Sequence, residues 1–413
     1  MQSKFEWPNL IKNLLLDISY TAKKIDIKNI AVVGGAVRDQ LLKKLNNSEF
    51  NAVNHTKDID LVIEGSVIEL VKMLEKELGL RRFYNLKLHK SYNSAEIKID
   101  GFKLDLSTAR LEEYEKPGEN PNIYPCIIEE DLKRRDFTIN SIGIDISSSK
   151  MIDPHGGQDS LKRRELKFLH SKSVEDDPTR IIRAARYSAR LAFNLHPKSL
   201  QQIQSTLSNW PWGWKEGDDN NLAPPALSTR LRLELELLIY QERWDIALKN
   251  LQGWGALVLL DHGLQNDLGW ERRLRWAKRL NVNLLTALIA GANNSLSLAS
   301  RLQLPKRQQD LLKESFEIEE FLNRSNLYKE SILWTPSKWS KSIENNHWNP
   351  QAVALTICKG GPMWRELLRW WGRWRLIQSP ITAKELMAKG WEAGPELGKK
   401  LKALRDTRLD NLR

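Results

Sequence analysis

Residues 30–39 read IAVVGGAVRD, and about twenty residues further along the chain residues 57–63 read KDIDLVI. The apolar, β-branched run before Gly34 predicts a short strand, and the spacing of apolar residues after Gly35 predicts a helix. A strand–turn–helix corner of this kind points backbone N–H groups and the positive end of the helix toward one spot. We therefore expect the two glycines to bind an anion.

The second stretch supplies negative charge beside this corner. Side chains alternate along a strand, so Asp58 and Asp60 project to one side while Ile59, Leu61 and Ile63 face the core. Two carboxylates held together repel each other unless a cation lies between them. Because Mg²⁺ binds through one or two carboxylates plus substrate phosphates, the pair beside a phosphate-binding corner indicates metal-assisted phosphoryl or nucleotidyl transfer.

The composition is that of a soluble globular protein with a polyanionic partner. The chain has 413 residues, 41% hydrophobic and 28% charged, enough for two or three domains. Its net charge of +12 favours a nucleic acid as partner. No apolar run reaches the ~18 residues of a membrane span, and the N-terminus predicts an amphipathic helix instead of a signal peptide. The two cysteines are far apart, which fits a reducing cytoplasm.

Three further segments extend the predicted head. Residues 94–106 alternate apolar and polar side chains on both sides of an Asp-Gly pair, which predicts a β-hairpin. Asp105 lies on its second arm and faces away from the apolar side, so it is a candidate third carboxylate of the site. Residues 114–130 contain several prolines and no clear period, which predicts a long mobile loop. Residues 131–145 run from a basic start into an apolar strand and place Arg135 at the edge of the site.

Residues 176–190 read DDPTRIIRAARYSAR and predict a helix with an acidic cap and a proline in its first turn. Arg180, Arg183 and Arg186 recur every three residues and form one stripe with Asp177 at its head. Such a stripe is often a solvated face. Alternatively, Asp177 accepts from an exocyclic amino group while Arg180 donates to the ring atom beside it, which would read the Watson–Crick edge of C or A. Arg183 and Arg186 would then face phosphate or ribose.

These stretches resemble the ordered motifs of the class II tRNA nucleotidyltransferases. That family contains the bacterial-type CCA-adding enzymes, which belong with bacterial poly(A) polymerases in the polymerase-β-like superfamily. The four motifs are GGAVRD at 34–39, KDID at 57–60, RRDFTIN at 134–140 and DDPTRIIRAAR at 176–186. Weaker similarity continues into LSTRLRLE at 227–234, ITAKEL at 381–386 and GPELG at 394–398. Ser141 and Asp176 depart from the usual Ala and Glu, and neither change removes a group that the chemistry needs.

The resemblance implies an α+β fold with a small polymerase-β-like nucleotidyltransferase head, built on a mixed sheet, followed by an all-helical neck, body and tail. We expect the catalytic head in residues 1–160, a neck with the base-recognition helix in 161–260, and a tRNA-binding body and tail in 261–413. Residues 208–225, rich in Trp, Gly, Pro, Asp and Asn, are the predicted linker.

The resemblance also assigns roles to individual side chains. It implies that Asp58 and Asp60 bind Mg²⁺, and with Asp105 they form the predicted catalytic set. The residues implied in nucleotide binding are Gly34, Gly35, Arg38 and Arg135 at the triphosphate, Asp177 and Arg180 at the base, and Arg183 and Arg186 beyond it. The protein itself supplies the template, and no nucleophilic Ser or Cys is required.

The implied reaction adds C, A or both from CTP and ATP to the 3′ end of tRNA without a nucleic-acid template. Addition of CCA, of A alone and of CC alone all remain open, although a loop with a Pro-Gly pair disfavours a CC-only enzyme. One alternative is a bacterial poly(A) polymerase, against which Leu80 interrupts a Gly-Arg-Arg-Phe-type element. Another is a non-catalytic RNA-binding protein on a transferase fold. The retained aspartates weigh against it, because repelling carboxylates are costly without a metal.

Overall fold

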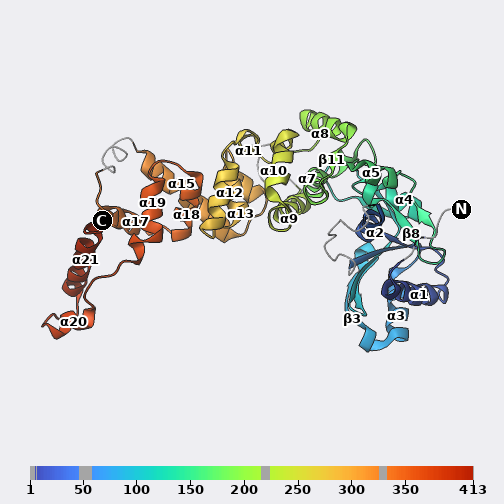
Figure 1. The fold of residues 1–413 in the computed structure, drawn as a ribbon, viewed down its shortest axis with the longest axis horizontal. Helices are drawn as coiled ribbons and strands as arrows, with labels where there is room; N and C mark the ends of the chain where they lie inside the picture. The colour runs from blue at the N-terminus through green and yellow to red at the C-terminus, as the bar shows by residue number, and fades with distance from the viewer. Residues whose placement is uncertain (1–4, 6, 46–57, 215–223, 325–332, 413) are drawn as a thin grey trace. The chain divides into compact units, whose positions relative to one another are not determined.

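The computed structural model describes residues 5, 7–45, 58–214, 224–324 and 333–412 (Figure 1). They form two compact units, one of residues up to Gly213 together with Pro224–Ala256, the other of Trp214 with the described residues from Leu257 onward. Lys57 and residues 215–223 of the predicted linker lie outside the described residues. The division of the first unit into head and neck at residue 160 stays a prediction.

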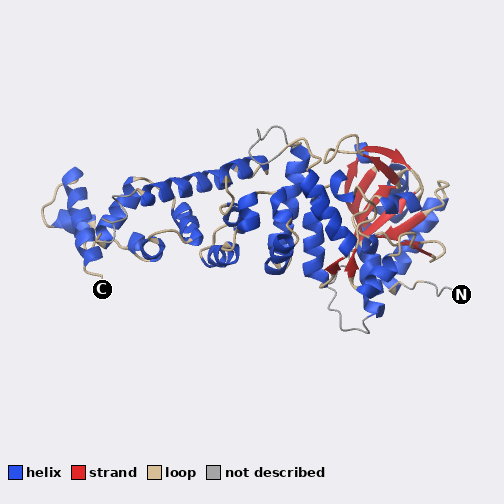
Figure 2. Ribbon diagram, turned by 90° about the horizontal axis from the view of Figure 1, so that it is seen from above, coloured by secondary structure: helices blue, strands red, loops and turns tan. Residues whose placement is uncertain are grey.

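The first unit contains a mixed sheet with the strand order β3-β4-β5-β2-β1-β8-β9, drawn in red in Figure 2. Strands β2 and β5 run parallel, and the other neighbours are antiparallel. This sheet and the helical remainder confirm the predicted fold class. The strands of the sheet are β1 (Ile30–Val33), β2 (Asp58–Ile63), β3 (Phe83–His89), β4 (Ser94–Ile99), β5 (Phe102–Thr108), β8 (Gly143–Asp145) and β9 (Met151–Ile152).

Helices surround this sheet and continue the first unit beyond it. They are α1 (Asn9–Lys23), α2 (Gly35–Leu45), α3 (Val67–Arg82), α4 (Ile128–Lys133), α5 (Gly157–Arg163), α6 (Ser173–Asp176), α7 (Thr179–Leu191), α8 (Pro197–Asn209), α9 (Pro225–Gln241) and α10 (Trp244–Gly253). Two short strands, β10 (Glu165–Leu166) and β11 (Asn194–Leu195), pair in parallel. The predicted N-terminal helix is α1, and its buried face includes Ile11, Leu14 and Ile18.

The second unit is helical throughout its described residues (Figure 2). Its helices are α11 (His262–Asn266), α12 (Trp270–Arg279), α13 (Leu284–Ile289), α14 (Ser295–Arg301), α15 (Lys306–Asn323), α17 (Pro336–Asn345), α18 (Pro350–Lys359), α19 (Trp364–Gly372), α20 (Ala383–Ala388) and α21 (Pro395–Asp410). Across the described parts of both units, every helix is too short or too polar to cross a membrane.

The predicted hairpin is present as β4 and β5. Asp100 and Gly101 both have positive φ, +50° and +84°, which suits a tight turn that follows the twist of the two strands. The same alternation that predicted the hairpin buries Leu104 and Leu106 and leaves Asp105 on the opposite face. The polar face of this hairpin therefore continues the polar face of β2, with which β5 is paired.

The segment predicted as a long loop is partly ordered into regular structure, so that prediction was wrong for residues 122–125 and 128–130. Asn122–Pro125 form β7, which pairs with β6 (Arg110–Glu113), and α4 begins at Ile128. The side chains of β7 are exposed or half-buried. This strand has little apolar alternation because backbone pairing with β6, and not a buried face, holds it in place.

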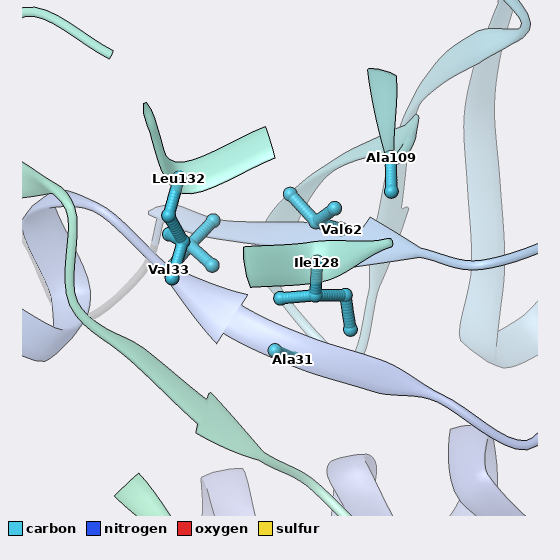
Figure 3. Close-up of a cluster of buried hydrophobic side chains, with 6 residues drawn as sticks. All are labelled: Ala31, Val33, Val62, Ala109, Ile128 and Leu132. Carbon is cyan, nitrogen blue, oxygen red and sulfur yellow. The ribbon is translucent and has the colours of Figure 1, made fainter. Parts of the chain in front are cut away.

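The core beneath the predicted site joins three elements that are distant in sequence. Ala31 and Val33 of β1 and Val62 of β2 pack against Ile128 and Leu132 of α4, with Ala109 beside them (Figure 3). Alternation along β2 places Val62 on the same face as Asp58 and Asp60, while Ile59, Leu61 and Ile63 are buried on the other. Helix α4 thus covers one end of the face whose other end carries the aspartates.

Candidate active site

The glycine corner is tight because two features require glycine at position 34. Its φ is +72°, a conformation that L side chains rarely adopt. A Cβ atom at this position would lie 3.0 Å from Oδ2 of Asp60 and 3.4 Å from Nη1 of Arg135. Helix α2 begins immediately afterwards at Gly35, so its first backbone N–H groups are placed beside the Asp60 carboxylate.

Three aspartates gather on the polar face of β2 and β5. The strand register pairs Asp60 with Asp105, and Asp58 precedes Asp60 on the same face. Oδ2 of Asp105 accepts a hydrogen bond of 2.9 Å from Lys103, and its Oδ1 is buried with no hydrogen-bond partner among the described residues. Burial raises the pKa of Asp60 above its ordinary value, and the charges of Asp105 and Asp58 add to this against the opposing charge of Arg135.

No group of three or more His, Cys, Asp or Glu side chains in the described part of the chain is arranged as a complete metal site. The donors on β2 itself are the carboxylates of Asp58 and Asp60. Mg²⁺ accepts such a set, since it is usually held by one or two carboxylates and completes its shell with water and substrate phosphates. The unpartnered oxygen of Asp105 and the raised pKa of Asp60 both fit a cation at this face.

Arg134 and Arg135 directly follow α4, and both belong to the site. Arg135 Nη2 donates to Asp131 at 3.3 Å, while its Nε is buried and makes no hydrogen bond. Arg134 donates to Asp131 and, at 2.9 Å, to Glu112. Although burial would raise the pKa of Asp131, the two guanidinium groups hold it below its ordinary value. Asp131 therefore anchors both arginines.

A cavity of about 470 Å³ opens at this face of the sheet. Six of its lining side chains are arginines and four are carboxylates, so the cavity is strongly polar. The lining residues are Gly34, Gly35, Asp60, Tyr92, Arg110, Glu112, Tyr114, Asn120, Pro121, Ile123, Arg134, Arg135, Asp136, Asn140, Asp177, Arg180, Arg183, Tyr187 and Arg230. Its volume lies within the range of small-molecule sites, and the excess of arginine favours an anionic ligand.

The structure brings most, but not all, of the predicted site residues to this cavity. Those that line it are Gly34, Gly35, Asp60, Arg135, Asp177, Arg180 and Arg183. Asp58 and Asp105 lie on the adjoining strand face, while Arg38 and Arg186 lie outside the lining. Sequence reasoning missed Arg110, Glu112 and Tyr114, which belong to β6 and the segment after it, and assigned no role to Arg230.

Arg38 is buried, with a relative exposure of 3%, and it bonds to protein atoms. Its Nε donates to Asp39 and its Nη1 donates to Asn140, each at 2.8 Å, and its guanidinium lies over the ring of Tyr187. In this arrangement Arg38 supports the first turn of α2 from behind. Arg38 is absent from the cavity lining, and its expected contact with a triphosphate stays a prediction.

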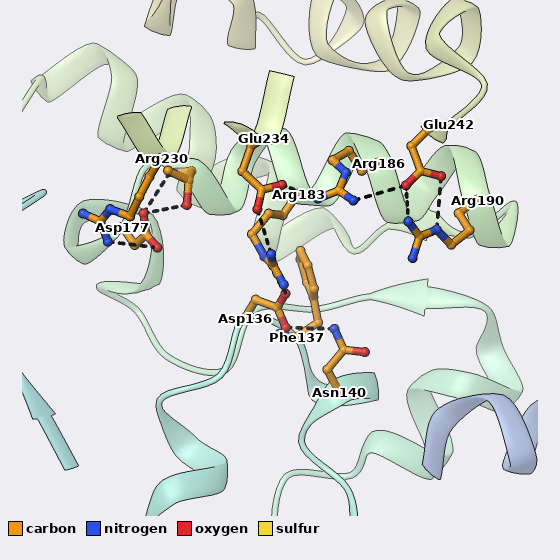
Figure 4. Close-up of polar contacts among 11 residues, drawn as sticks. Asp136, Phe137, Asn140, Asp177, Arg183, Arg186, Arg190, Arg230, Glu234 and Glu242 are labelled. Carbon is orange, nitrogen blue, oxygen red and sulfur yellow. Dashed lines mark hydrogen bonds and ion pairs between the residues drawn. The ribbon is translucent and has the colours of Figure 1, made fainter. Parts of the chain in front are cut away.

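Three arginines of α7, Arg183, Arg186 and Arg190, face acidic side chains (Figure 4). Arg183 donates to Asp136 at 2.7 Å and 2.9 Å and to Glu234 of α9 at 2.8 Å. Arg186 pairs with Glu234 and Glu242, and Arg190 also pairs with Glu242. Asn140 donates to Asp136, which connects this series of ion pairs to Arg38. The pairs join α7 to α9.

Asp177 stands at the head of α7 with its two oxygens used differently. Oδ1 accepts from the backbone N–H and the hydroxyl of Thr179 at 3.1 Å and 2.7 Å, which fixes the carboxylate at the start of the helix. Oδ2 lies 3.8 Å from Nη1 of Arg230, whose Nη2 donates to the carbonyl oxygen of Gly118 (Figure 4). Arg230 thereby connects Asp177 to the segment after β6. In the sequence, the LSTRLRLE motif at 227–234 was the only signal that pointed to Arg230.

The chain matches one protein-family model and several known proteins. The family model of the poly A polymerase head domain matches residues 30–167. The chain is 28% identical over 377 residues to the CC-adding tRNA nucleotidyltransferase of Deinococcus radiodurans, covering 90% of this chain and 82% of that protein. It is 37% identical over 237 residues to the A-adding tRNA nucleotidyltransferase of Aquifex aeolicus, covering 57% of this chain and 26% of that much longer protein.

Solved structures show the same fold. A CCA-adding enzyme in its apo form II matches with a TM-score of 0.71 and 22% identity, covering 98% of this chain and 93% of that one. The complex of a CCA-adding enzyme with CTP matches with a TM-score of 0.70, 22% identity and the same coverage. The matched head region contains the glycine corner, the aspartates and Arg135. The chain is thus similar to the CC-adding and A-adding tRNA nucleotidyltransferases, and its residues 30–167 match the poly A polymerase head domain.

Proposed function

We propose that this protein is a tRNA 3′-end nucleotidyltransferase that adds C, A or both from CTP and ATP without a nucleic-acid template. The observation that carries the proposal is the contact between Gly34 and Asp60 at the edge of an arginine-lined cavity. That contact puts a helix N-terminus suited to phosphate beside a carboxylate suited to a divalent cation. The homologues named CC-adding and A-adding enzymes support the substrate class.

Asp58 and Asp60 would hold Mg²⁺, with Asp105 on the neighbouring strand as the third carboxylate of the catalytic set. When bound, the cation supplies positive charge to the phosphates and makes the attacking hydroxyl easier to deprotonate. The fit rests on the paired register of Asp60 and Asp105 and on the unpartnered Oδ1 of Asp105.

The remaining groups of the site position the nucleotide. The first N–H groups of α2 and the Arg135 guanidinium would contact the triphosphate, while Asp177 and Arg180 would read the base. The tRNA 3′-hydroxyl then attacks the α-phosphate, the new P–O bond forms in line with the departing pyrophosphate, and the P–O bond to the β-phosphate breaks. Arg183, two of whose three hydrogen bonds go to Asp136 and the third to Glu234, would border the sugar.

Arg38 and Arg186 would act in this proposal through other residues. Arg38 holds Asn140 and the start of α2 in place, and Arg186 holds α7 against α9. Both would therefore influence nucleotide binding without touching the nucleotide.

The proposal extends to the chain as a whole. Residues 1–160 would be the catalytic head, residues 161–260 the neck with the base-recognition helix α7, and residues 261–413 the body and tail that bind the acceptor arm of tRNA. The net charge of +12 suits this partner. A tRNA-processing role places the protein in the cytoplasm.

One assay tests the function and its nucleotide choice together. Purified protein with Mg²⁺ is offered labelled ATP or CTP separately, with tRNAs that end at the discriminator base, at C and at CC. Labelling of tRNA with one or both nucleotides supports the proposal, and the tRNA that is extended distinguishes CCA, CC and A addition. Extension of an unrelated RNA by many A residues would instead support a poly(A) polymerase. Absence of transfer with retained tRNA binding would support the non-catalytic alternative.

A further inference from the structure

Arg180 is held by protein atoms at both of its terminal nitrogens. It is buried, with a relative exposure of 5%, although it lines the cavity. Nη1 donates to the hydroxyl of Ser173 at 2.5 Å, and Nη2 donates to the carbonyl oxygen of Arg134 at 2.6 Å. Nη1 also lies 3.3 Å from Nε2 of His170. These contacts come from three separate elements and fix the plane of the guanidinium.

The direction of the His170 contact follows from chemistry. A guanidinium has five N–H donors and no acceptor, so Nε2 of His170 must accept. The proton of the neutral ring then lies on Nδ1, which is 3.8 Å from Oδ2 of Asp176. A doubly protonated imidazole has no lone pair to offer and would place a second positive charge against Arg180.

The charged groups around His170 are Arg180 on α7, Lys133 at the end of α4 and Asp176 at the end of α6. The two cations favour the neutral ring, whereas an ionised Asp176 favours the protonated one. Burial, followed by the charges of Arg180 and Lys133, lowers the pKa of His170 to about 4. Burial raises the pKa of Asp176 to about 6. Above about pH 6 the neutral ring therefore lies between a carboxylate and a guanidinium.

The backbone of His170 is itself anchored. Its carbonyl oxygen accepts from Gln202 Nε2 of α8 at 3.0 Å and from the backbone N–H of Ser173 at 3.2 Å. His170 is absent from the cavity lining. The contact that links this side chain directly to the cavity lining is the one with Arg180.

Because both terminal nitrogens of Arg180 bond to protein atoms, only some of its N–H groups remain to bind a ligand. Both hydrogens of Nη1 and one of Nη2 are used, and within the described part of the chain Nε–H and the second Nη2 hydrogen make no hydrogen bond. Nε–H shares one edge of the planar guanidinium with a hydrogen of Nη2, and this edge can form paired, parallel hydrogen bonds. Rotation of the guanidinium would replace this pair with a different one.

We propose that His170 is a positioning residue for nucleotide selection, whose Nε2 lone pair orients Arg180 so that a fixed pair of N–H donors faces the base. The inference rests on the proposed function, in which Arg180 reads the base. His170 is not a catalytic residue, because it touches neither the nucleotide nor the reacting atoms.

The test compares His170→Leu, which removes the acceptor, with His170→Gln, whose Oε1 can accept where Nε2 did. His347→Leu, at an exposed histidine of the second unit, is the matched control. The full-length variants are assayed for kcat/KM with ATP and CTP against UTP and GTP, on the tRNA that the unaltered protein extends. We expect His170→Leu to lower discrimination about tenfold, and His170→Gln to restore it to within about threefold.

Several outcomes would overturn the inference. Unchanged discrimination in His170→Leu would do so, as would equal losses in His170→Leu and His170→Gln, which indicate packing alone. If the unaltered protein transfers nucleotides and His170→Leu selects normally, only the positioning role fails. If the unaltered protein transfers nothing to any tRNA, the proposed function fails and the inference fails with it.

A second measurement is independent of folding defects in variants and of activity. Nitrogen NMR of the histidine-labelled protein at pH 7.5 reports which ring nitrogen of His170 carries the proton. We expect a neutral ring with Nδ1 protonated and Nε2 bare. A proton on Nε2 at this pH would contradict the acceptor role directly.

Discussion

The carboxylate of Asp60 lies against the backbone of Gly34, so closely that a Cβ atom at position 34 would be 3.0 Å from Oδ2 of Asp60. The glycine corner, proposed to bind phosphate, and the proposed metal ligand therefore lie side by side. Glycine is required here for its lack of a side chain and for its positive φ of +72°.

Gly34→Ala should impair both activity and stability, because it forces a strained φ and pushes the Asp60 carboxylate away from the corner. We expect a loss of about 1–2 kcal/mol in the free energy of unfolding and a fall of tenfold or more, on the order of 1.4 kcal/mol, in kcat/KM. Gly35→Ala is the control for stability, since φ is not positive there and a Cβ would meet only Arg38 Nη2 at 3.6 Å. Equal thermal stability of the two variants would contradict the prediction that Ala at position 34 strains the backbone.

Glu234→Ala should destabilise the first unit strongly. Glu234 is 12% exposed and accepts from both Arg183 and Arg186, so its removal leaves the half-buried guanidinium of Arg183 and the buried one of Arg186 each short of a partner. We expect a loss of about 3 kcal/mol in urea unfolding. Glu236→Ala on the same helix is the control: its carboxylate is 37% exposed and 3.9 Å from Arg232, and its loss should cost less than about 1 kcal/mol. Similar losses in both variants would rule out a special role for the buried pairs.

The glycine corner, the aspartate pair and the β4–β5 hairpin could be predicted because contiguous residues determine them. Alternation alone places Asp58 and Asp60 on one face, and an Asp-Gly pair determines the tight turn. The helix that starts after Pro178 was predictable for the same reason. These local patterns predicted the head of the molecule and part of the cavity lining.

The partners of the α7 arginines could not be predicted locally. Arg183 and Glu234 are 51 residues apart and meet only because α9 packs on α7. The stripe of arginines looks the same in sequence whether it faces water, phosphate or acidic side chains. Strand β7 was missed because its residues show little apolar alternation, and the motif that contains Arg38 does not reveal that its side chain bonds to Asp39 and Asn140.

Acid should remove the stabilisation that Asp136 provides. Burial would raise the pKa of Asp136, but Arg183 and Asn140 hold it below its ordinary value, which is about 3.9 in an unfolded chain. The folded state thus binds fewer protons than the unfolded state, so this stabilisation is complete above about pH 5 and is lost as pH falls. Asp136→Asn should be less stable by about 2–3 kcal/mol at pH 7, with the gap narrowing toward pH 3. A gap independent of pH would contradict this assignment.

Unlike Asp136→Asn, which should destabilise the protein, Asp60→Asn should stabilise the metal-free protein. The pKa of Asp60 is raised by burial and by its neighbours Asp105 and Asp58, so its ionised form is unfavourable at neutral pH in the folded chain. We expect a gain of roughly 1 kcal/mol at pH 7 without divalent cations, shrinking as pH falls and Asp60 takes up a proton. The measurement is urea unfolding in EDTA. A loss of stability in this variant would show that the carboxylate serves the fold.

The catalytic role of the aspartate pair is measured most directly by nucleotide transfer to tRNA in Asp58→Asn and Asp60→Asn, with tRNA binding recorded on the same preparations. Asp159→Asn, whose carboxylate is 70% exposed, is the matched control. We predict a loss of transfer of about a thousandfold or more in the first two variants, with tRNA affinity within about twofold of the unaltered protein and normal activity in Asp159→Asn. Transfer retained in Asp60→Asn, or lost together with tRNA binding, would contradict a metal-binding aspartate pair beside the glycine corner.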